Sequence, residues 1–239
     1  MMFITALTFC SLTYHVTVAQ EWQSAGHIAK YGLAFKNTKH FGWNASPAFV
    51  RRANELATPY LDLYQFGVYT GGSMMQMGVK IKSYRRMWGF DSFQGLPKEA
   101  ENLRIEGKHW LPGGFSSKGA LQVKTPKEAM HIVTSKLNNP NVTLIPGFFN
   151  DSLPTIDLSS CRPALVVDID SDLYISAKQA LTWLFKNKLA RIGTLIRYDD
   201  WNRGDRSWGE PKAHYEVSKE FGVNFRNFRP AEFEVTAIA

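Results

Sequence analysis

Residues 164–172 read ALVVDIDSD, and this stretch decides the fold class of the 239-residue chain. It is nearly all apolar until its acids, which is typical of a strand that is buried on both faces. Side chains two positions apart on a strand point to one face, so Asp168, Asp170 and Asp172 should point the same way. A buried strand that ends in acids indicates a parallel sheet with a ligand site at the carboxyl ends of its strands.

Further strands and helices alternate on both sides of this stretch. The sequence predicts strands at 60–69, 86–91 and 142–145 before it and at 194–198 after it. Helices are expected at 73–83, at 126–137 with Thr125 as the N-cap, and at 174–189. Two last strands, 223–228 and 233–238, should form a hairpin. This alternation predicts an α/β fold: a mostly parallel, seven-stranded sheet flanked by helices, with an antiparallel C-terminal hairpin.

The N-terminal part of the chain differs from the rest. We expect residues 1–45 to form an extension and residues 46–239 to form the main domain, with a lid-like insertion near 98–124. Residues 1–19 are fairly apolar but lack a basic start, which favours a packing segment over a cleaved signal peptide and leaves secretion as the alternative. The apolar start and the hairpin tail together suggest a homodimer.

Composition excludes several classes of function. The net charge of +7 comes from scattered basic residues without a basic stripe, which favours a solvated surface over nucleic-acid binding. No run of 18 apolar residues occurs, so we expect no membrane span. Cys10 and Cys161 are the only cysteines, which excludes a disulfide framework and fits a reducing compartment. A cytoplasmic protein is the expectation.

Two glycine-containing segments indicate a nucleoside site. Residues 65–73 read QFGVYTGGS, where glycines after a strand allow a tight turn and close approach of a ligand. Residues 89–97 read GFDSFQGLP, and Asp91 follows Gly71 by 20 residues, the spacing at which an acid binds a ribose diol in dinucleotide folds. The alternatives are a plain strand-to-helix turn and an Asp that caps the following loop.

Carboxylates gather at the ends of two predicted strands. Asp170 and Asp172 follow the strand at 164–170, and Asp199 with Asp200 follow the next strand. Burying this many acids without a cation is costly, and oxygen-rich sites suit Mg²⁺, Mn²⁺ or Ca²⁺. Zinc is disfavoured because no His/Cys cluster has ligand spacing. The alternative is that the acids cap helices and pair with nearby Arg and Lys, and Asp172 in particular could cap the next helix.

These segments resemble the macrocin O-methyltransferase family (TylF/MycF type), which methylates hydroxyls on sugars of natural products. The similarity rests on FGVYTGGS at 66–73, GFDSFQGLP at 89–97, GFFNDSLP at 147–154, DSDLYISA at 170–177 and DDW at 199–201. It covers roughly residues 60–215. The resemblance implies a Rossmann-like class I methyltransferase fold that binds S-adenosylmethionine (SAM).

The resemblance also implies roles for single residues. Asp170, Asp199 and Asp200 would bind Mg²⁺. Asp172 would be the general base. The residues expected at the SAM site are Gln65, Phe66, Gly67, Tyr69, Ser73, Asp91 and Ser92, with Phe149, Asp151 and Ser152 near the adenine.

The chain departs from the family pattern at several positions. Gln65 stands where members usually carry Glu, and Asp168 is an acid that the pattern does not require. Residues 108–122 match only loosely, and this region would shape the choice of acceptor. The first 45 or so residues match nothing usable.

The function expected from the resemblance is SAM- and Mg²⁺-dependent O-methylation of a hydroxyl on a sugar or another small molecule with vicinal hydroxyls. Two alternatives remain: a metal-dependent glycosyltransferase that binds a nucleotide sugar through its Asp-x-Asp, and a non-catalytic SAM-binding domain. The candidate pocket residues for the acceptor are Trp110, Phe115, Trp201, Trp208 and His214, of which His214 is a lesser candidate for a second base.

Overall fold

A seven-stranded sheet organises the computed structural model, which describes residues 42–103, 110–201 and 204–239. The strand order is β3-β2-β1-β4-β5-β7-β6. Strands β1 to β5 are parallel, and β7 runs antiparallel to both of its neighbours. The strands are β1 (Asp62–Phe66), β2 (Met87–Asp91), β3 (Val142–Pro146), β4 (Ala164–Ile169), β5 (Leu195–Tyr198), β6 (Val223–Arg229) and β7 (Glu232–Ile238). The predicted α/β class, the mostly parallel sheet and the C-terminal hairpin are confirmed.

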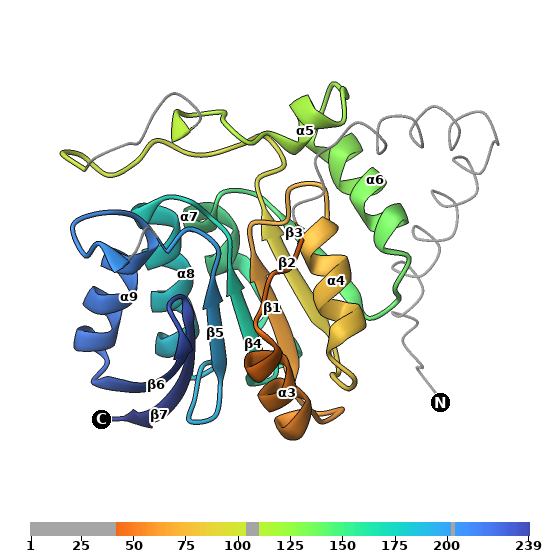
Figure 1. The fold of residues 1–239 in the computed structure, drawn as a ribbon. Helices are drawn as coiled ribbons and strands as arrows, with labels where there is room; N and C mark the ends of the chain where they lie inside the picture. Colours follow the sequence, from red (N-terminus) through yellow and green to blue (C-terminus); the bar gives the residue numbers. More distant parts are fainter. Residues whose placement is uncertain (1–41, 104–109, 202–203) are drawn as a thin grey trace, which may run out of the picture. The chain divides into compact units, whose positions relative to one another are not determined.

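Helices cover both faces of this sheet (Figure 1). They are α3 (Pro47–Leu56), α4 (Gly72–Lys80), α5 (Ser117–Ala120), α6 (Pro126–Leu137), α7 (Phe149–Ser152), α8 (Tyr174–Lys186) and α9 (Gly209–Glu220), with short 3-10 turns at Leu153–Thr155 and Leu158–Ser160. Helix α6 begins as predicted, because the Thr125 side chain accepts a hydrogen bond from the backbone N–H of Glu128. Helices α3, α5, α7 and α9 were not predicted from the sequence.

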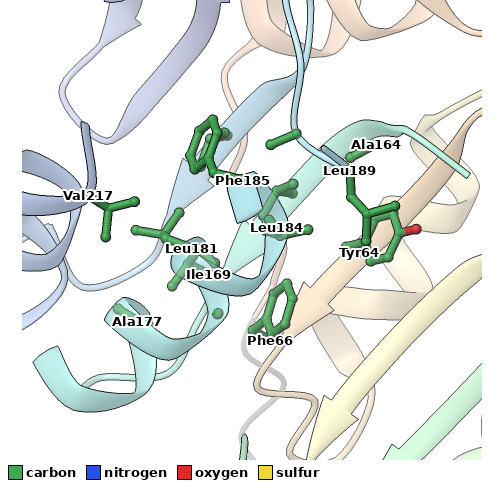
Figure 2. Close-up of a cluster of buried hydrophobic side chains, with 14 of the residues drawn as sticks. Tyr64, Phe66, Ala164, Ile169, Ala177, Leu181, Leu184, Phe185, Leu189 and Val217 are labelled. Atoms are coloured by element: carbon green, nitrogen blue, oxygen red, sulfur yellow. The ribbon is translucent and has the colours of Figure 1, made fainter. Parts of the chain in front are cut away.

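The main core lies between α8 and the sheet (Figure 2). The apolar face of this helix is buried, with Leu181 and Leu184 at its centre. They pack against a cluster that includes Tyr64 and Phe66 of β1 and Ile169 of β4. Each fully buried leucine contributes about 1.5–3 kcal/mol of transfer free energy, so this face holds α8 to the sheet.

Local backbone geometry decides where the elements end. Helix α8 ends at Lys186, before the predicted Leu189, because Lys188 takes a left-handed φ of 55°. Strand β1 ends at Phe66, since Gly67 turns the chain with a φ of 93°. The C-terminal end of α8 and the carboxyl end of β1 are therefore each set by a residue with a positive φ.

The edges of the predicted domain can be described in part. Residues 1–41 lie outside the described residues, and they contain the signal-like stretch and most of the predicted extension. Residues 104–109 of the predicted insertion lie outside them as well. Residues 42–45 lie against the domain through Trp43, which is fully buried and packs edge-on against Phe49 of α3. Within the insertion, Ser116 caps the short helix α5. In the described part of the chain, no helix has the length and apolar character needed to cross a membrane.

Candidate active site

The turn after β1 brings the ends of two strands together. Gly67 has no room for a side chain, because a Cβ atom there would lie 1.7 Å from the carbonyl oxygen of Asp170. The backbone N–H of Gly67 donates to the carbonyl of Phe90 in β2, and that of Asp170 donates to the carbonyl of Phe66. The glycine turn, the end of β2 and the end of β4 thus form one closely packed edge of the sheet.

Asp91 fixes the glycine turn from the neighbouring strand. Its Oδ2 accepts hydrogen bonds from the backbone N–H groups of Val68 and Tyr69, both at 2.8 Å. Its Oδ1 accepts from the N–H of Phe93 at 2.6 Å. Burial raises the pKa of Asp91, and the three N–H donors oppose that rise. Asp91 therefore holds the glycine turn and, as the alternative expected, also caps the following loop, and both the turn and Asp91 line a cavity.

This cavity has a volume of about 320 Å³ and opens at the carboxyl ends of the strands. It joins the glycine turn to the acids that follow β4 and β5. Its lining includes ten residues that were expected from the sequence at the SAM, metal or catalytic site, namely Gly67, Tyr69, Ser73, Asp91, Ser92, Phe149, Asp170, Asp172, Asp199 and Asp200. A site at this edge is where parallel α/β sheets bind their ligands.

Three of the acids come together as a group that could hold a cation. One carboxylate oxygen each from Asp170, Asp199 and Asp200 lies within 4.8 Å of the other two. Strands β4 and β5 are parallel neighbours, so their ends place these side chains together. Three converging carboxylate oxygens are a donor set that suits a hard divalent cation.

Three acids of the cavity, Asp170, Asp172 and Asp200, hold protons more tightly than ordinary carboxyls. Burial and the nearby charge of Asp199 raise the pKa of Asp170 well above its usual value. Burial and the charge of Asp200 do the same to the pKa of Asp172. Burial and Asp199 raise the pKa of Asp200 to about 6. Carboxylates that repel one another in this way are stabilised by any cation that binds among them.

Asp172 does not cap the helix that follows it, so that alternative is wrong. The N-cap of α8 is Leu173, which makes no side-chain capping bond. Glu99 of the insertion takes this role instead, because its carboxylate accepts from the N–H groups of Tyr174 at 2.8 Å and Ile175 at 3.0 Å. Asp172 has a left-handed φ of 60° and lines the cavity.

Glu210 is a site-building residue that the sequence analysis missed. It is fully buried at the start of α9, and its carboxylate accepts from the N–H of Ser171 at 3.0 Å and of Asp200 at 2.9 Å. It therefore ties the loop after β4 to the loop after β5. The only signal in the sequence was an acid in the first turn of a helix that we did not predict.

Four residues expected at the SAM site do not line the cavity. Gln65 is fully buried beneath it and donates to Ser73 Oγ at 2.5 Å. Phe66 stacks on Phe90 in the core. Asp151 is exposed beside the Asn150 side chain, and Ser152 is buried and donates to the carbonyl of Phe148.

The aromatic candidates divide into two groups. Trp110 and Phe115 line the cavity and contact each other edge-on, with ring centroids 5.9 Å apart. Both belong to the insertion, whose described parts cross the carboxyl end of the sheet in Figure 1. Trp201, Trp208 and His214 are not among the lining residues.

His214 is a core residue of α9. Its ring packs against Phe233 at 4.4 Å between centroids, and its Nδ1 shares a 2.9 Å hydrogen bond with the Tyr198 hydroxyl. Burial lowers the pKa of His214 to about 3, so the ring is neutral near pH 7. It lies apart from the cavity lining and is not placed to act as a second base.

The chain has named relatives among characterised enzymes. It is 29% identical over 147 residues to the 8-demethyl-8-(2,3-dimethoxy-α-L-rhamnosyl)-tetracenomycin-C 4′-O-methyltransferase of Streptomyces olivaceus. It is 28% identical over 144 residues to the demethyldecarbamoylnovobiocin O-methyltransferase of Streptomyces niveus. Each match covers 59% of this chain and 52% of the relative, so the chain matches about half the length of these enzymes.

Solved structures share the fold. A calicheamicin methyltransferase superposes with a TM-score of 0.57 at 18% identity, over 92% of this chain and 83% of that one. The O-methyltransferase NovP superposes with a TM-score of 0.55 at 21% identity, over 80% of this chain and 78% of that one. These likenesses show that the sheet and its helices have the Rossmann-like architecture of class I methyltransferases.

The family model for macrocin O-methyltransferase (TylF) matches residues 54–213, which is more than half of the chain. This range contains the glycine turn, Asp91 and all four acids at the ends of β4 and β5. The chain therefore belongs to the macrocin O-methyltransferase (TylF) family.

Proposed function

We propose that the chain catalyses SAM-dependent O-methylation of a hydroxyl on a sugar or another small molecule with vicinal hydroxyls, with a divalent cation such as Mg²⁺ bound at its acids. The observation that carries the proposal is the single cavity that the glycine turn, Asp91 and the acids of β4 and β5 all line. One cavity can bring a methyl donor and a metal-held hydroxyl within reach of each other.

The donor half of the cavity fits a nucleoside. Asp91 accepts three backbone N–H bonds and still faces the cavity, where its carboxylate can accept further bonds from ribose hydroxyls. Ser92 and Phe149 line the cavity as well. Bound there, SAM would supply an electrophilic methyl group on a sulfonium. The role of the chain is to hold that methyl in line with an acceptor oxygen.

The acid half fits a divalent cation. Asp170, Asp199 and Asp200 offer converging oxygens, and Asp172 and Glu210 add further negative charge close by. The Arg197 guanidinium pairs with Asp199 and Asp168 and so compensates part of this charge. The negative charge that remains favours the binding of Mg²⁺ or Mn²⁺. A cation bound by these three aspartates would lower the pKa of an acceptor hydroxyl and orient it.

Asp172 is the residue we propose as the general base. It lines the cavity beside Asp200, and burial with that neighbouring charge raises its pKa well above the usual value. A carboxylate with a raised pKa is a better proton acceptor, and such catalysis typically contributes roughly 10²–10⁴-fold. The acceptor O–H would pass its proton to Asp172 as the oxygen forms its bond to the methyl carbon and the carbon–sulfur bond breaks.

The acceptor class follows from the relatives and from the cavity wall. Both curated relatives are named as O-methyltransferases of natural products, and one name specifies a rhamnosyl group. In this chain, Trp110 and Phe115 give the cavity an aromatic wall beside the acids. An aromatic ring packs well on the apolar face of a sugar, and the adjacent acids suit its hydroxyls. We therefore propose a glycosylated or otherwise hydroxylated natural product.

Family membership favours methyl transfer over the two alternatives. The Asp-x-Asp of a glycosyltransferase is matched here only by the acids after β4, whereas the family model also spans the glycine turn and Asp91. A purely SAM-binding domain would not need the converging acids.

The test combines binding with turnover. The purified chain is mixed with SAM, Mg²⁺ and a panel of glycosides and catechols, with and without EDTA, and methylated product is measured by mass spectrometry. Asp172→Asn should retain S-adenosylhomocysteine (SAH) binding and lose turnover, while Asp157→Asn, which changes an exposed cap of a 3-10 turn, should match the wild type. Turnover that resists EDTA would remove the metal from the proposal. Thermal stabilisation by UDP-sugars with Mn²⁺ and not by SAH would favour the glycosyltransferase.

A further inference from the structure

Asp168 is the acid that the family pattern did not require, and it has a clear structural partner. It lies in the middle of the sheet on β4, in register with Gln65 of β1 on one side and Arg197 of β5 on the other. Its side chain is fully buried. It is not among the residues that line the cavity, so it cannot contact a ligand there directly.

Two donors converge on one oxygen of this carboxylate. Arg197 Nη1 lies 2.8 Å from Asp168 Oδ1, and the indole Nε1 of Trp43 donates to the same oxygen at 3.1 Å. Trp43 is fully buried and held in turn by Gln76, whose side chain accepts from its backbone N–H. Asp168 is thus fixed from two directions.

Arg197 connects the buried Asp168 to Asp199, which lines the cavity. Its side chain is 4% exposed, and its other terminal nitrogen, Nη2, lies 2.5 Å from Asp199 Oδ1. The planar guanidinium therefore bridges the buried Asp168 and the partly exposed Asp199, which follows the last residue of β5. A rigid fork of this kind fixes the direction of a carboxylate better than a single flexible ammonium would.

Asp168 also compensates the positive charge of Arg197. The positive charge of the Arg197 guanidinium lies beside Asp199. Without a counter-ion it would oppose the binding of a metal ion, since like charges repel at short range. The carboxylate of Asp168 compensates the guanidinium on the side that faces away from the cavity. Arg197 can then hold Asp199 while adding less positive charge to the site than an unpaired guanidinium would.

We propose that Arg197 is a positioning residue for the metal ligand Asp199, and that Asp168 is the buried counter-ion that makes this arrangement compatible with a bound cation. The inference rests on the proposed metal site and adds two residues that act on it from outside the cavity. Groups that orient a metal ligand in this way typically change metal affinity 10–100-fold when they are altered.

Two variants separate geometry from charge. Arg197→Lys keeps the positive charge but cannot bridge both carboxylates. Asp168→Asn keeps an oxygen that can accept from Arg197 and Trp43 but removes the compensating charge. The matched control is Arg85→Lys, because Arg85 bridges the buried Asp62 at the start of β1, away from the cavity, with distances of 2.9 and 2.6 Å.

The experiment is titration calorimetry of Mn²⁺ into SAH-saturated protein without an acceptor, with the SAH affinity and the melting temperature measured for each variant. We expect both site variants to weaken Mn²⁺ binding about tenfold or more while SAH affinity stays within about twofold, and Arg85→Lys to match the wild type. Asp168→Asn serves as the second probe if Arg197→Lys does not fold, since it preserves the hydrogen-bonding shape.

The outcomes separate this inference from the proposed function. Wild-type protein that does not bind Mn²⁺ would overturn the metal site and this inference with it. Wild-type binding with unchanged affinity in Arg197→Lys and Asp168→Asn would overturn the inference alone. A parallel loss of SAH binding in both variants would also overturn it, because such a loss indicates a general structural role.

Discussion

The pKa of Asp200 makes a quantitative prediction about the metal-free protein. Burial and the charge of Asp199 raise it from the ordinary 3.8 to about 6. A difference of this size corresponds to about 3 kcal/mol between the two protonation states. The folded state holds this proton more tightly than the unfolded chain does. Its contribution to stability is therefore complete below about pH 3.8 and is lost as the pH rises through 6.

The assay is urea unfolding in EDTA at pH 4 and pH 7.5, for the wild type and for Asp200→Asn. The comparison between the two proteins reports the titration of Asp200 together with the effect of its charge on the pKa values of Asp170, Asp172 and Glu210, which acts in the same direction. We expect the free energy of unfolding of the wild type to fall by up to about 3 kcal/mol more than that of the variant between the two pH values. An identical pH dependence in both proteins would refute the reasoning.

Saturating Mg²⁺ extends this test. A cation among Asp170, Asp199 and Asp200 replaces protons on those oxygens, so it should restore stability at pH 7.5 and have little effect at pH 4. A stabilisation by Mg²⁺ that is equal at both pH values would contradict the idea that protons and metal compete for the same carboxylates.

Three further predictions concern single positions. Glu99→Gln removes the charge that caps the N-terminus of α8, and we expect a loss of about 1–2 kcal/mol in urea unfolding, whereas no loss would mean that the cap is dispensable. Gly67→Ala would place a methyl 1.7 Å from the Asp170 carbonyl oxygen, so we expect a loss above about 3 kcal/mol or insoluble protein, and near-wild-type stability would show that the two strand ends can separate. His214→Phe keeps the aromatic packing and removes a neutral ring nitrogen from Tyr198, so the pH profile of methyl transfer should not change, and loss of the low-pH limb of that profile would restore His214 as a base.

The parts of the fold that depend on local sequence were predictable. Strand β4 is a run of apolar residues that ends in acids, and α6 begins with Thr125 and Pro126, so both patterns lie within a few neighbouring positions. The meeting of Asp170 with Asp199 also followed, because the carboxyl ends of neighbouring parallel strands share one edge. Helix α9 escaped prediction because its first turn, Gly-Glu-Pro, reads as a loop and its N-cap, Trp208, makes no side-chain capping bond.

The partners of the site could not be predicted, because they come from far along the chain. Glu99 binds the N-terminus of α8 across 75 positions, and Trp43 binds Asp168 across 125. No spacing rule connects such residues before the fold is known. Gln65 shows that a local motif can also mislead. Its position in the glycine-turn motif predicted contact with SAM, yet its side chain points into the protein and donates to Ser73.

The close approach of Gly67 to the Asp170 carbonyl has a consequence for how a protein with the proposed function could change its acceptor. The glycine turn at Gly67 and the chain at Asp170, a proposed metal ligand, are in close backbone contact, so neither can shift without the other. Under the proposed function, the distance between the methyl donor and the metal would then be a fixed dimension of the sheet. Adaptation to a larger or differently shaped acceptor must occur elsewhere, in the insertion that carries Trp110 and Phe115. Libraries aimed at new acceptors should therefore vary residues of the insertion and leave the strand ends unchanged.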